Sequence, residues 1–301
     1  MGKVLTLLYH RVTDYKNDPQ MLCVTPVHFE EQIKWISSEY KIVRFDDDWG
    51  ELTDDAVCIT FDDGYRDNFL NAVPILNSLN QLATIFVSTG NIDTKKEMWW
   101  DELERNFLLE KKYHHSFVLK DKQYGAEFNT VDKAHREDVY KTFHWLLNNF
   151  VGIEKRNDWF SQLQNWNGYS RDGREENYSL QTRDLKSIDL KNITIGAHTL
   201  NHPRLSMLTY AEQKYEITQS LEKLEMLFNR EINTFSYPFG GKADYNSDSI
   251  KICQDLYMKR VAANFPGIWD EHTDEFQVPR NIVRDWELEI FKQKIKEFWR
   301  G

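Results

Sequence analysis

Three short segments of the sequence combine residue types and spacings that could carry out a reaction. Residues 60–64 read TFDDG, residues 198–203 read HTLNHP and residues 235–241 read FSYPFGG. Each lies at the end of an apolar run that predicts a buried β-strand. The carboxyl ends of the strands in a parallel sheet or βα barrel face the usual active-site cleft. We therefore expect the three segments to meet at one mouth.

The polar residues of two segments suggest a metal site with a base beside it. Asp62 and Asp63 are adjacent, and successive strand residues point to opposite sides, so the two carboxylates can do different jobs. His198 and His202 are four residues apart, and on a helical turn this spacing places both imidazoles on one face, where they suit one metal ion. Taken alone, Asp-Asp-Gly is also common in turns, and such histidine pairs also occur by chance.

The third segment and the first strand complete the arrangement. Pro238 and two glycines predict a shaped loop whose backbone can approach a ligand, although an ordinary strand-to-helix turn has the same composition. His10 follows the first predicted strand at the same mouth. One carboxylate and two imidazoles leave metal positions open, as a catalytic zinc site requires, and the second carboxylate is left as a base. A non-haem iron oxygenase uses a similar ligand set, but the strand–helix alternation and the second aspartate argue against it.

The elements that must position these residues alternate between short apolar strands and amphipathic helices. Strands are predicted at residues 4–9, 41–45, 56–61, 83–88, 193–197, 232–237, 260–264 and 276–283. Helices are predicted after Thr25-Pro26, over 68–79, from Thr209 to about 229, over 247–256, and at the end of the chain with Asp285 as the cap. This order favours a parallel sheet or a βα barrel with helices outside.

A middle region, about 92–191, breaks the alternation. It contains predicted helices at 98–109, 132–150 and 154–164 and a small hairpin around 120–123. We expect a single domain, 1–301, that carries this mostly helical region as an insertion after the fourth strand. Because loops at strand ends carry specificity, we expect the insertion to form one wall of the cleft. Trp99 and Trp100 at its start could stack on a sugar, or pack in its core as most tryptophans do.

Composition excludes several other classes of protein. The chain has 301 residues and a net charge of −10, which disfavours nucleic acids and anionic membranes as partners because both require basic patches. Three separated cysteines do not make a disulfide framework. No transmembrane segment is expected, and the apolar run at the N-terminus is too short for a signal peptide, so we expect a cytoplasmic protein. Nothing in the sequence indicates an oligomeric state.

Together, the three segments resemble the first three motifs of the polysaccharide deacetylases of carbohydrate esterase family 4, also called the NodB homology domain. TFDDG, HTLNHP and SYPFGG occur in the family's order, and the resemblance covers about residues 3–90 and 192–285. It implies a distorted (β/α) barrel of about seven parallel strands. It also implies a divalent metal, usually Zn²⁺, and hydrolysis of N-acetyl, or less often O-acetyl, groups on a glycan. The N-acetyl reaction cleaves a carbon–nitrogen bond that is not a peptide bond.

The resemblance assigns roles residue by residue. Asp62 corresponds to the general base. Asp63, His198 and His202 correspond to the metal ligands. The main-chain N–H of Phe239 corresponds to the group that helps to bind the oxyanion. This set is chemically coherent, since the base can take a proton from water while the metal and the N–H stabilise the charge on the acetyl oxygen.

Two departures from the family pattern need substitutes. Many members have an arginine two residues before the proline of the third motif, where this chain has Ser236; Arg280 is the candidate that would orient the base instead. The C-terminal Leu-x-His that supplies the acid in many members is missing. A subset resembling the poly-N-acetylglucosamine deacetylases takes the acid from a Tyr-His pair after the first strand, which Tyr9-His10 matches. The alternatives are a packed core histidine at position 10 and, for the whole chain, an inactive or metal-free glycan-binding protein on the same fold.

Overall fold

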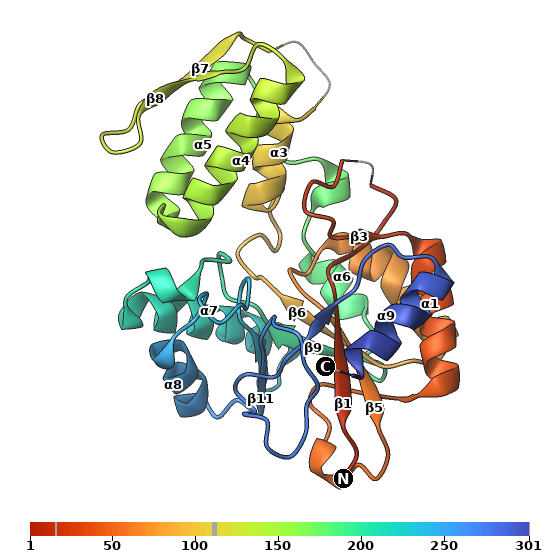
Figure 1. Cartoon of the computed structure of the whole chain (residues 1–301). Helices are drawn as coiled ribbons and strands as arrows, with labels where there is room; N and C mark the ends of the chain where they lie inside the picture. The colour runs from red at the N-terminus through yellow and green to blue at the C-terminus, as the bar shows by residue number, and fades with distance from the viewer. Residues whose placement is uncertain (16, 110–112, 301) are drawn as a thin grey trace. The chain divides into compact units, whose positions relative to one another are not determined.

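The computed structural model describes residues 1–15, 17–109 and 113–300 of the chain. It divides the chain into two compact units, which we call unit 1 and unit 2 (Figure 1). Unit 1 comprises Met1–Asp93 and Leu180–Gly301, and unit 2 comprises Thr94–Ser179. In the part of the chain that is described, none of the helices combines the length and the apolarity that a bilayer span requires.

Unit 1 is built on one parallel sheet. Its strands run in the order β11-β10-β9-β6-β5-β1-β12, with β4 paired to β5 beside this path. The strand bounds are β1 Val4–Tyr9, β4 Lys41–Val43, β5 Ala56–Phe61, β6 Ala83–Val87, β9 Ile193–Ala197, β10 Thr234–Ser236, β11 Arg260–Ala262 and β12 Asn281–Ile282. The seven strands of the path curl into a half-barrel, which confirms the predicted distorted (β/α) barrel. A separate two-stranded parallel sheet pairs β2 (Arg11–Val12) with β3 (Cys23–Val24).

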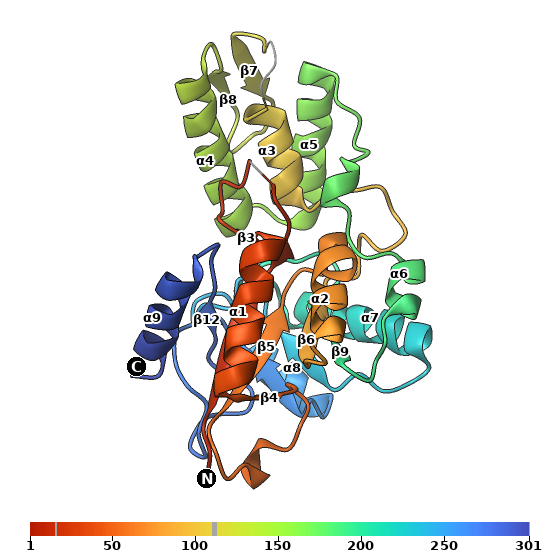
Figure 2. The same cartoon turned by 90° about the vertical axis from the view of Figure 1, so that its right-hand side faces the viewer.

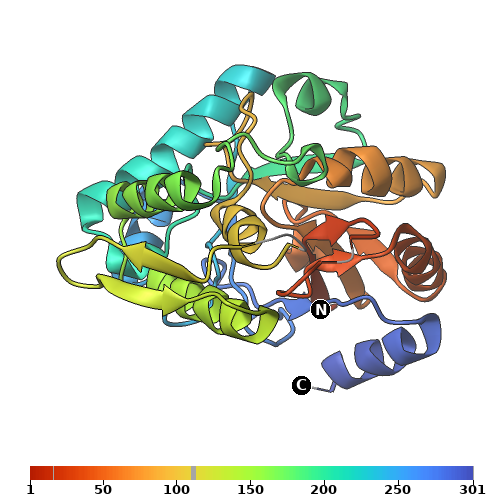
Figure 3. The ribbon, with the colours of Figure 1, turned by 90° about the horizontal axis from the view of Figure 1, so that it is seen from above.

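Helices lie outside these strands (Figures 2 and 3). Their bounds are α1 Pro26–Glu39, α2 Val73–Ser78, α6 Thr182–Ser187, α7 Tyr210–Phe228, α8 Ser247–Asp255 and α9 Leu288–Phe298. Local sequence explains where they begin. The Thr25 side chain accepts a hydrogen bond from the N–H of His28, with Pro26 in the first turn. Thr209 and Glu212 form the predicted capping box of α7. The predicted helix at 68–79 instead opens with a π-helix, Asn68–Ala72.

The core of unit 1 consists of the strands themselves. Every residue of β1, β5, β6 and β9 is buried, as expected of strands covered on both faces. Leu7, Ile59 and Ile85 are fully excluded from solvent. Burying each side chain of this kind stabilises the fold by roughly 1.5–3 kcal/mol. This rigid sheet fixes the loops that follow the strands.

The C-terminal elements differ from the sequence prediction. The strand expected at 276–283 is reduced to β12 and one isolated bridge between Val278 and Ala262, because the intervening Pro279 has no N–H for a ladder. Asp285 does not cap α9, whose N-cap is Glu287. The Asp285 carboxylate instead accepts hydrogen bonds from the Thr25 N–H and hydroxyl, at 2.8 and 2.9 Å.

Unit 2 is mostly helical, as predicted. Its elements are α3 Trp99–Phe107, β7 Ser116–Leu119, β8 Ala126–Asn129, α4 Lys133–Asn149 and α5 Ile153–Asn167. The antiparallel pair β7–β8 is the predicted hairpin, and Asp121 accepts hydrogen bonds from the N–H groups of Gln123 and Tyr124 in its turn. The compact unit is shorter than the expected insertion at 92–191, because α6 belongs to unit 1. The assignment of 1–301 to a single domain stays a prediction.

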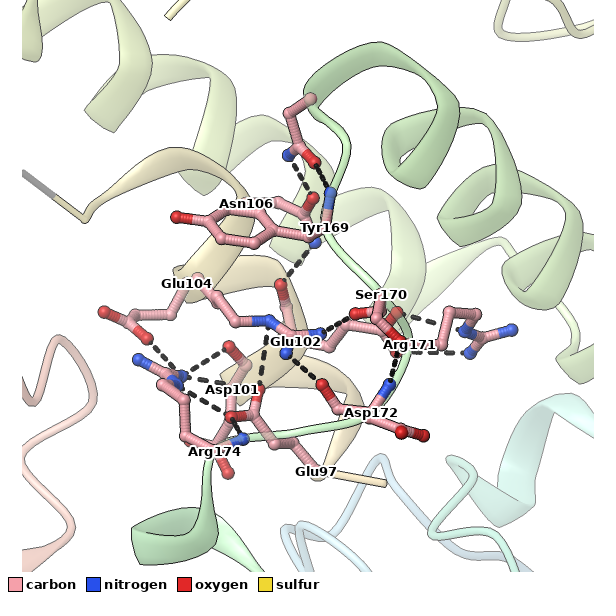
Figure 4. A network of polar contacts seen from close by, with 12 residues as sticks. Glu97, Asp101, Glu102, Glu104, Asn106, Tyr169, Ser170, Arg171, Asp172 and Arg174 are labelled. Carbon is pink, nitrogen blue, oxygen red and sulfur yellow. Dashed lines mark hydrogen bonds and ion pairs between the residues drawn. The ribbon is translucent and has the colours of Figure 1, made fainter. Parts of the chain in front are cut away.

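A buried polar network joins α3 to the segment after α5 within unit 2 (Figure 4). Glu97 accepts from the Arg174 N–H and Nε at 2.6 and 2.7 Å. Arg171 donates to both oxygens of Glu102, at 3.0 and 3.1 Å. Gly173 packs so closely on Glu97 that a Cβ atom would lie 2.3 Å from its Cγ. The network therefore requires the charged side chains that pair in it, and it requires glycine at position 173.

Candidate active site

Two aspartates leave the end of β5 in different directions. Asp62 continues the strand, and its N–H donates to the Tyr9 carbonyl at 3.1 Å. Asp63 has a left-handed backbone, with φ of 72°. Gly64 follows with φ of 71°, and a Cβ there would lie 2.9 Å from Cγ1 of Val87. The turn therefore separates the two buried carboxylates, as the adjacent-aspartate argument predicted.

Asp63 faces two histidines. Its Oδ1 lies 3.5 Å from Nε2 of His198 and 3.3 Å from Nε2 of His202. One ligand atom from each of the three residues falls within 4.8 Å of the others, and all three residues are buried. Ligand atoms bound tetrahedrally to zinc at 2.0–2.1 Å stand about 3.3–3.4 Å apart. The two distances to Asp63 therefore fit a divalent metal.

A hydrogen bond orients His198, and burial keeps His202 neutral, as metal binding requires. The Nδ1–H of His198 donates to the Ser236 carbonyl at 2.8 Å, which directs Nε2 toward Asp63 and is the usual support of a metal-bound histidine. Burial lowers the pKa of His202 in spite of Asp63, so this ring is held neutral, the form that binds metal. Burial alone would raise the pKa of Asp63, but its hydrogen bonds with both histidines hold it well below the usual value.

The loop between the two histidines is not the helical turn expected from their spacing. Thr199 and His202 have positive φ angles, 62° and 51°. The Thr199 hydroxyl accepts from the His202 N–H at 3.1 Å. Glu216 of α7 receives hydrogen bonds from the N–H and side-chain amide of Asn201, at 2.8 and 2.7 Å. A looped backbone anchored to α7 therefore brings the two imidazoles together. Glu216, which lies outside the three motifs, and Thr199, which lies inside one without an assigned role, are functional candidates that the sequence analysis missed.

Asp62 is held by Arg280, the substitute expected from the sequence. The guanidinium donates to both carboxylate oxygens, at 2.7 and 2.6 Å. Ser236, at the position of the family arginine, donates its hydroxyl to Asp62 Oδ2 at 3.1 Å and accepts from Arg280 at 2.8 Å. Burial alone would raise the pKa of Asp62, but Arg280 and His198 hold it below its usual value. The carboxylate is therefore ionised and fixed in orientation.

Phe239 presents a main-chain donor on the loop after β10. Its φ is 61°, and among the described residues its N–H donates no hydrogen bond. Its carbonyl accepts from the Asn264 side chain at 2.9 Å, and its ring packs against His202 at 4.7 Å between centroids. At Gly240 a Cβ would meet the Asn264 N–H nitrogen at 2.8 Å, which explains the glycine. The predicted shaped loop thus lies beside the histidines.

His10 lies close to the two aspartates. It follows β1, which pairs with β5 residue by residue, Tyr9 opposite Phe61. Burial lowers the pKa of His10, and Asp63 and Asp62 act in the opposite direction. Among the described residues, its ring forms no hydrogen bond. The strand pairing places His10 beside the two aspartates, and its role as the acid stays a prediction.

The two tryptophans that open unit 2 are core residues. Trp99 and Trp100 are 7% and 4% exposed. Their rings pack edge to face at 5.3 Å, and Trp99 lies against His144 at 5.1 Å. The suggestion that they stack on a sugar is therefore wrong, since neither ring has a free face. The expectation that the insertion forms a wall of the cleft stays a prediction.

Comparisons with known proteins identify the family of this chain. The family model described as polysaccharide deacetylase matches residues 50–150 and 153–261. The Bacillus subtilis protein named "Putative polysaccharide deacetylase YxkH" is 21% identical over 273 residues, which cover 88% of this chain and 66% of that protein. The chain therefore spans slightly less than two thirds of the length of this curated relative.

Solved structures show the same fold. The Streptococcus pyogenes deacetylase PplD, solved in complex with acetate, is 17% identical with a TM-score of 0.60, covering 97% of each chain. The polysaccharide deacetylase BC0361 from Bacillus cereus is 19% identical with a TM-score of 0.61, covering 97% of this chain and 69% of that one. Because the family model matches most of the sequence, this chain belongs to the polysaccharide deacetylase family.

Proposed function

We propose that this protein is a metal-dependent hydrolase that removes N-acetyl, or less often O-acetyl, groups from a glycan or sugar derivative. Family membership supports a deacetylase. The observation that carries the proposal is the buried group of Asp63, His198 and His202 next to Asp62. A protein that had only kept the fold would not need three buried ligand atoms and a separate, fixed carboxylate.

Asp63, His198 and His202 would hold the metal. Three protein ligands leave coordination positions open, which is typical of a catalytic rather than a structural site. Mixed imidazole and carboxylate ligands suit zinc, which we propose as the metal. When bound, such an ion polarises an acetyl carbonyl and lowers the pKa of a water molecule.

Asp62 is the proposed base. An ionised carboxylate offers about four lone-pair sites. Arg280 uses one on each oxygen, and Ser236 uses a second on Oδ2. One site on Oδ1 remains for a water molecule, so Asp62 can accept the proton of the attacking water without leaving Arg280. The guanidinium then stabilises the orientation of the carboxylate throughout.

Two further groups would act on the acetyl group and on the departing amine. The Phe239 N–H, which donates no hydrogen bond within the described chain, would donate to the oxyanion of the tetrahedral intermediate. His10 would protonate the amine nitrogen as the carbon–nitrogen bond breaks, since an amine leaves poorly without a proton. An imidazole can hold and release this proton near neutral pH.

The test is acetate release from a panel of N-acetylated and O-acetylated sugars. We expect activity in metal-loaded protein, loss after chelation and recovery with Zn²⁺. Asp63→Asn should abolish release, whereas the matched surface variant His272→Ala should not, because the His272 side chain is 84% exposed. Release that persists after chelation, or no release from any acetylated sugar by metal-loaded protein, would contradict the proposal and favour a binding protein on the same fold.

A further inference from the structure

We propose that Asp67 and Asn68 are positioning residues for His10: they fix the main chain on its carboxyl side and so hold its imidazole beside the two aspartates. The inference rests on the proposed function, because it takes His10 as the acid of that reaction. No motif in the sequence pointed to either residue.

The two side chains bind the backbone that follows His10. The Asn68 amide donates to the carbonyl of His10 itself, at 2.8 Å. Asp67 accepts from the Val12 N–H at 2.9 Å through Oδ1 and from Arg11 Nε at 2.8 Å through Oδ2. Asn68 also donates to Asp67 at 3.2 Å, so the two side chains brace each other. On the amino side, the Tyr9 carbonyl accepts from the Asp62 N–H at 3.1 Å.

Arg11 strengthens this attachment. It is 2% exposed, and its guanidinium lies over the Tyr65 ring at 4.3 Å from the centroid. A buried arginine paired with Asp67 and covered by an aromatic ring has little freedom to move. The residue next to His10 is thus anchored through its side chain, while His10 is anchored through its carbonyl.

The helix that carries Asn68 has an unusual shape at this point. The segment Asn68–Ala72 is a π-helix, a wide turn that often marks functional sites. Asn68 begins it, and Asn71 within it donates to the Val12 carbonyl at 2.7 Å. Two asparagines of the same turn therefore bind two carbonyls of the same extended segment. Of these two asparagines, Asn68 binds the carbonyl of His10 and Asn71 that of Val12.

His10 depends on this backbone anchoring. Its ring forms no hydrogen bond within the described part of the chain, so its direction is set by its main chain and by packing. An acid must reach the leaving nitrogen to within hydrogen-bond distance, and small displacements in an active site cost on the order of 100-fold in rate. A purely structural role for Asn68 would affect all substrates equally, whereas a role through His10 would affect amides selectively.

The experiment compares losses of kcat/KM on an N-acetyl sugar and on an aryl acetate, whose phenolate leaves without a proton. Asn68→Ala should lose about 10-fold or more on the amide and less than about 3-fold on the ester. The matched control Asn71→Ala removes the same type of bond two residues beyond His10. It should lower kcat/KM on both substrates by the same small factor. Metal content and the melting temperature are measured for each variant.

His10→Ala is run in parallel so that the two claims fail separately. If His10→Ala is selective for the amide and Asn68→Ala is not, the positioning role is wrong while the acid role stands. If His10→Ala lowers kcat/KM equally on both substrates, the acid role is wrong, and the inference that depends on it is wrong as well. Should Asn68→Ala not fold, Asp67→Asn is tested instead, because it keeps an acceptor for the Val12 N–H but loses the ion pair with Arg11, the residue next to His10. This variant must show the same selectivity; equal losses on both substrates would overturn the positioning role.

Discussion

Arg280 and Asp62 form a bidentate ion pair across the curled sheet, with contacts of 2.7 and 2.6 Å. Arg280 directly precedes β12, and Asp62 directly follows β5. The Arg280 Nε donates to the Ala263 carbonyl at 2.7 Å, so the guanidinium plane is fixed before it meets the carboxylate. Both side chains are almost completely buried. An arginine far along the chain thus binds Asp62, while Ser236 stands at the position where the resemblance places an arginine.

Replacing Arg280 by lysine tests whether the geometry of this pair matters. Lysine keeps the positive charge but cannot bind both oxygens of Asp62 in one plane. We expect Arg280→Lys to lower kcat on the order of 10- to 100-fold while metal content is unchanged. Full activity in this variant would show that charge alone suffices.

Asp62→Asn should separate the base from the metal ligands. The amide cannot take up a proton from water, so we expect kcat to fall on the order of 100-fold or more. Because Asp62 Oδ2 lies 3.9 Å from His198 Nε2, whereas Asp63 Oδ1 lies closer to both histidines, the variant should keep its metal. Metal loss in Asp62→Asn, with retention in Asp63→Asn, would mean that the two roles are reversed.

The position of much of this site could be predicted because its polar residues directly follow apolar strands. The apolar run of β5 and the two aspartates are adjacent in the sequence, so the local pattern alone places both carboxylates at the end of a strand. The loop of His198 and His202 could not be predicted in shape, because its left-handed residues depend on Glu216 in the following helix. Likewise, Asn68 looks like any helix residue until the strand end that it binds is known. Contacts between distant segments leave little trace in local periodicity.

The predicted start of the last helix was wrong for a similar reason. Asp285 has the type and position of a helix cap, but its carboxylate binds Thr25, the N-cap of α1, and His28 in the first turn of α1, whose Nδ1 lies at 2.7 Å. The helix then begins two residues later, after Glu287. At this position a tertiary contact thus overrides the local capping signal.

His10→Ala should distinguish an acid from a structural histidine. Removing the proton donor slows departure of an amine but not of a phenolate. We expect kcat/KM for the N-acetyl substrate to fall on the order of 100-fold, with a much smaller loss on the aryl acetate. Negligible losses on both substrates would leave His10 without a part in the reaction.

The polar network of unit 2 should be essential for stability. Glu97 is fully buried, and Arg174 supplies two of its hydrogen bonds. Arg174→Met removes the hydrogen bond from Nε to Glu97 and the ion pair with Glu104 at 2.7 Å, and leaves Arg105 Nε at 3.6 Å from Glu97. We expect this loss of a buried ion-pair partner to cost about 3 kcal/mol in the free energy of unfolding. Urea denaturation followed by tryptophan fluorescence measures it. Lys141→Met, which breaks an exposed ion pair with Asp138 at 3.7 Å, is the control and should cost less than about 1 kcal/mol.

The most direct test of the proposed chemistry is metal bound per chain, measured by elemental analysis alongside acetate release, in the wild-type protein and in His202→Ala. His202 contributes one of the three clustered ligand atoms and lies 3.3 Å from Asp63. We predict about one divalent ion per wild-type chain, and loss of both metal and acetate release in His202→Ala, with both retained in His272→Ala. Full metal content and full activity in His202→Ala would contradict the account.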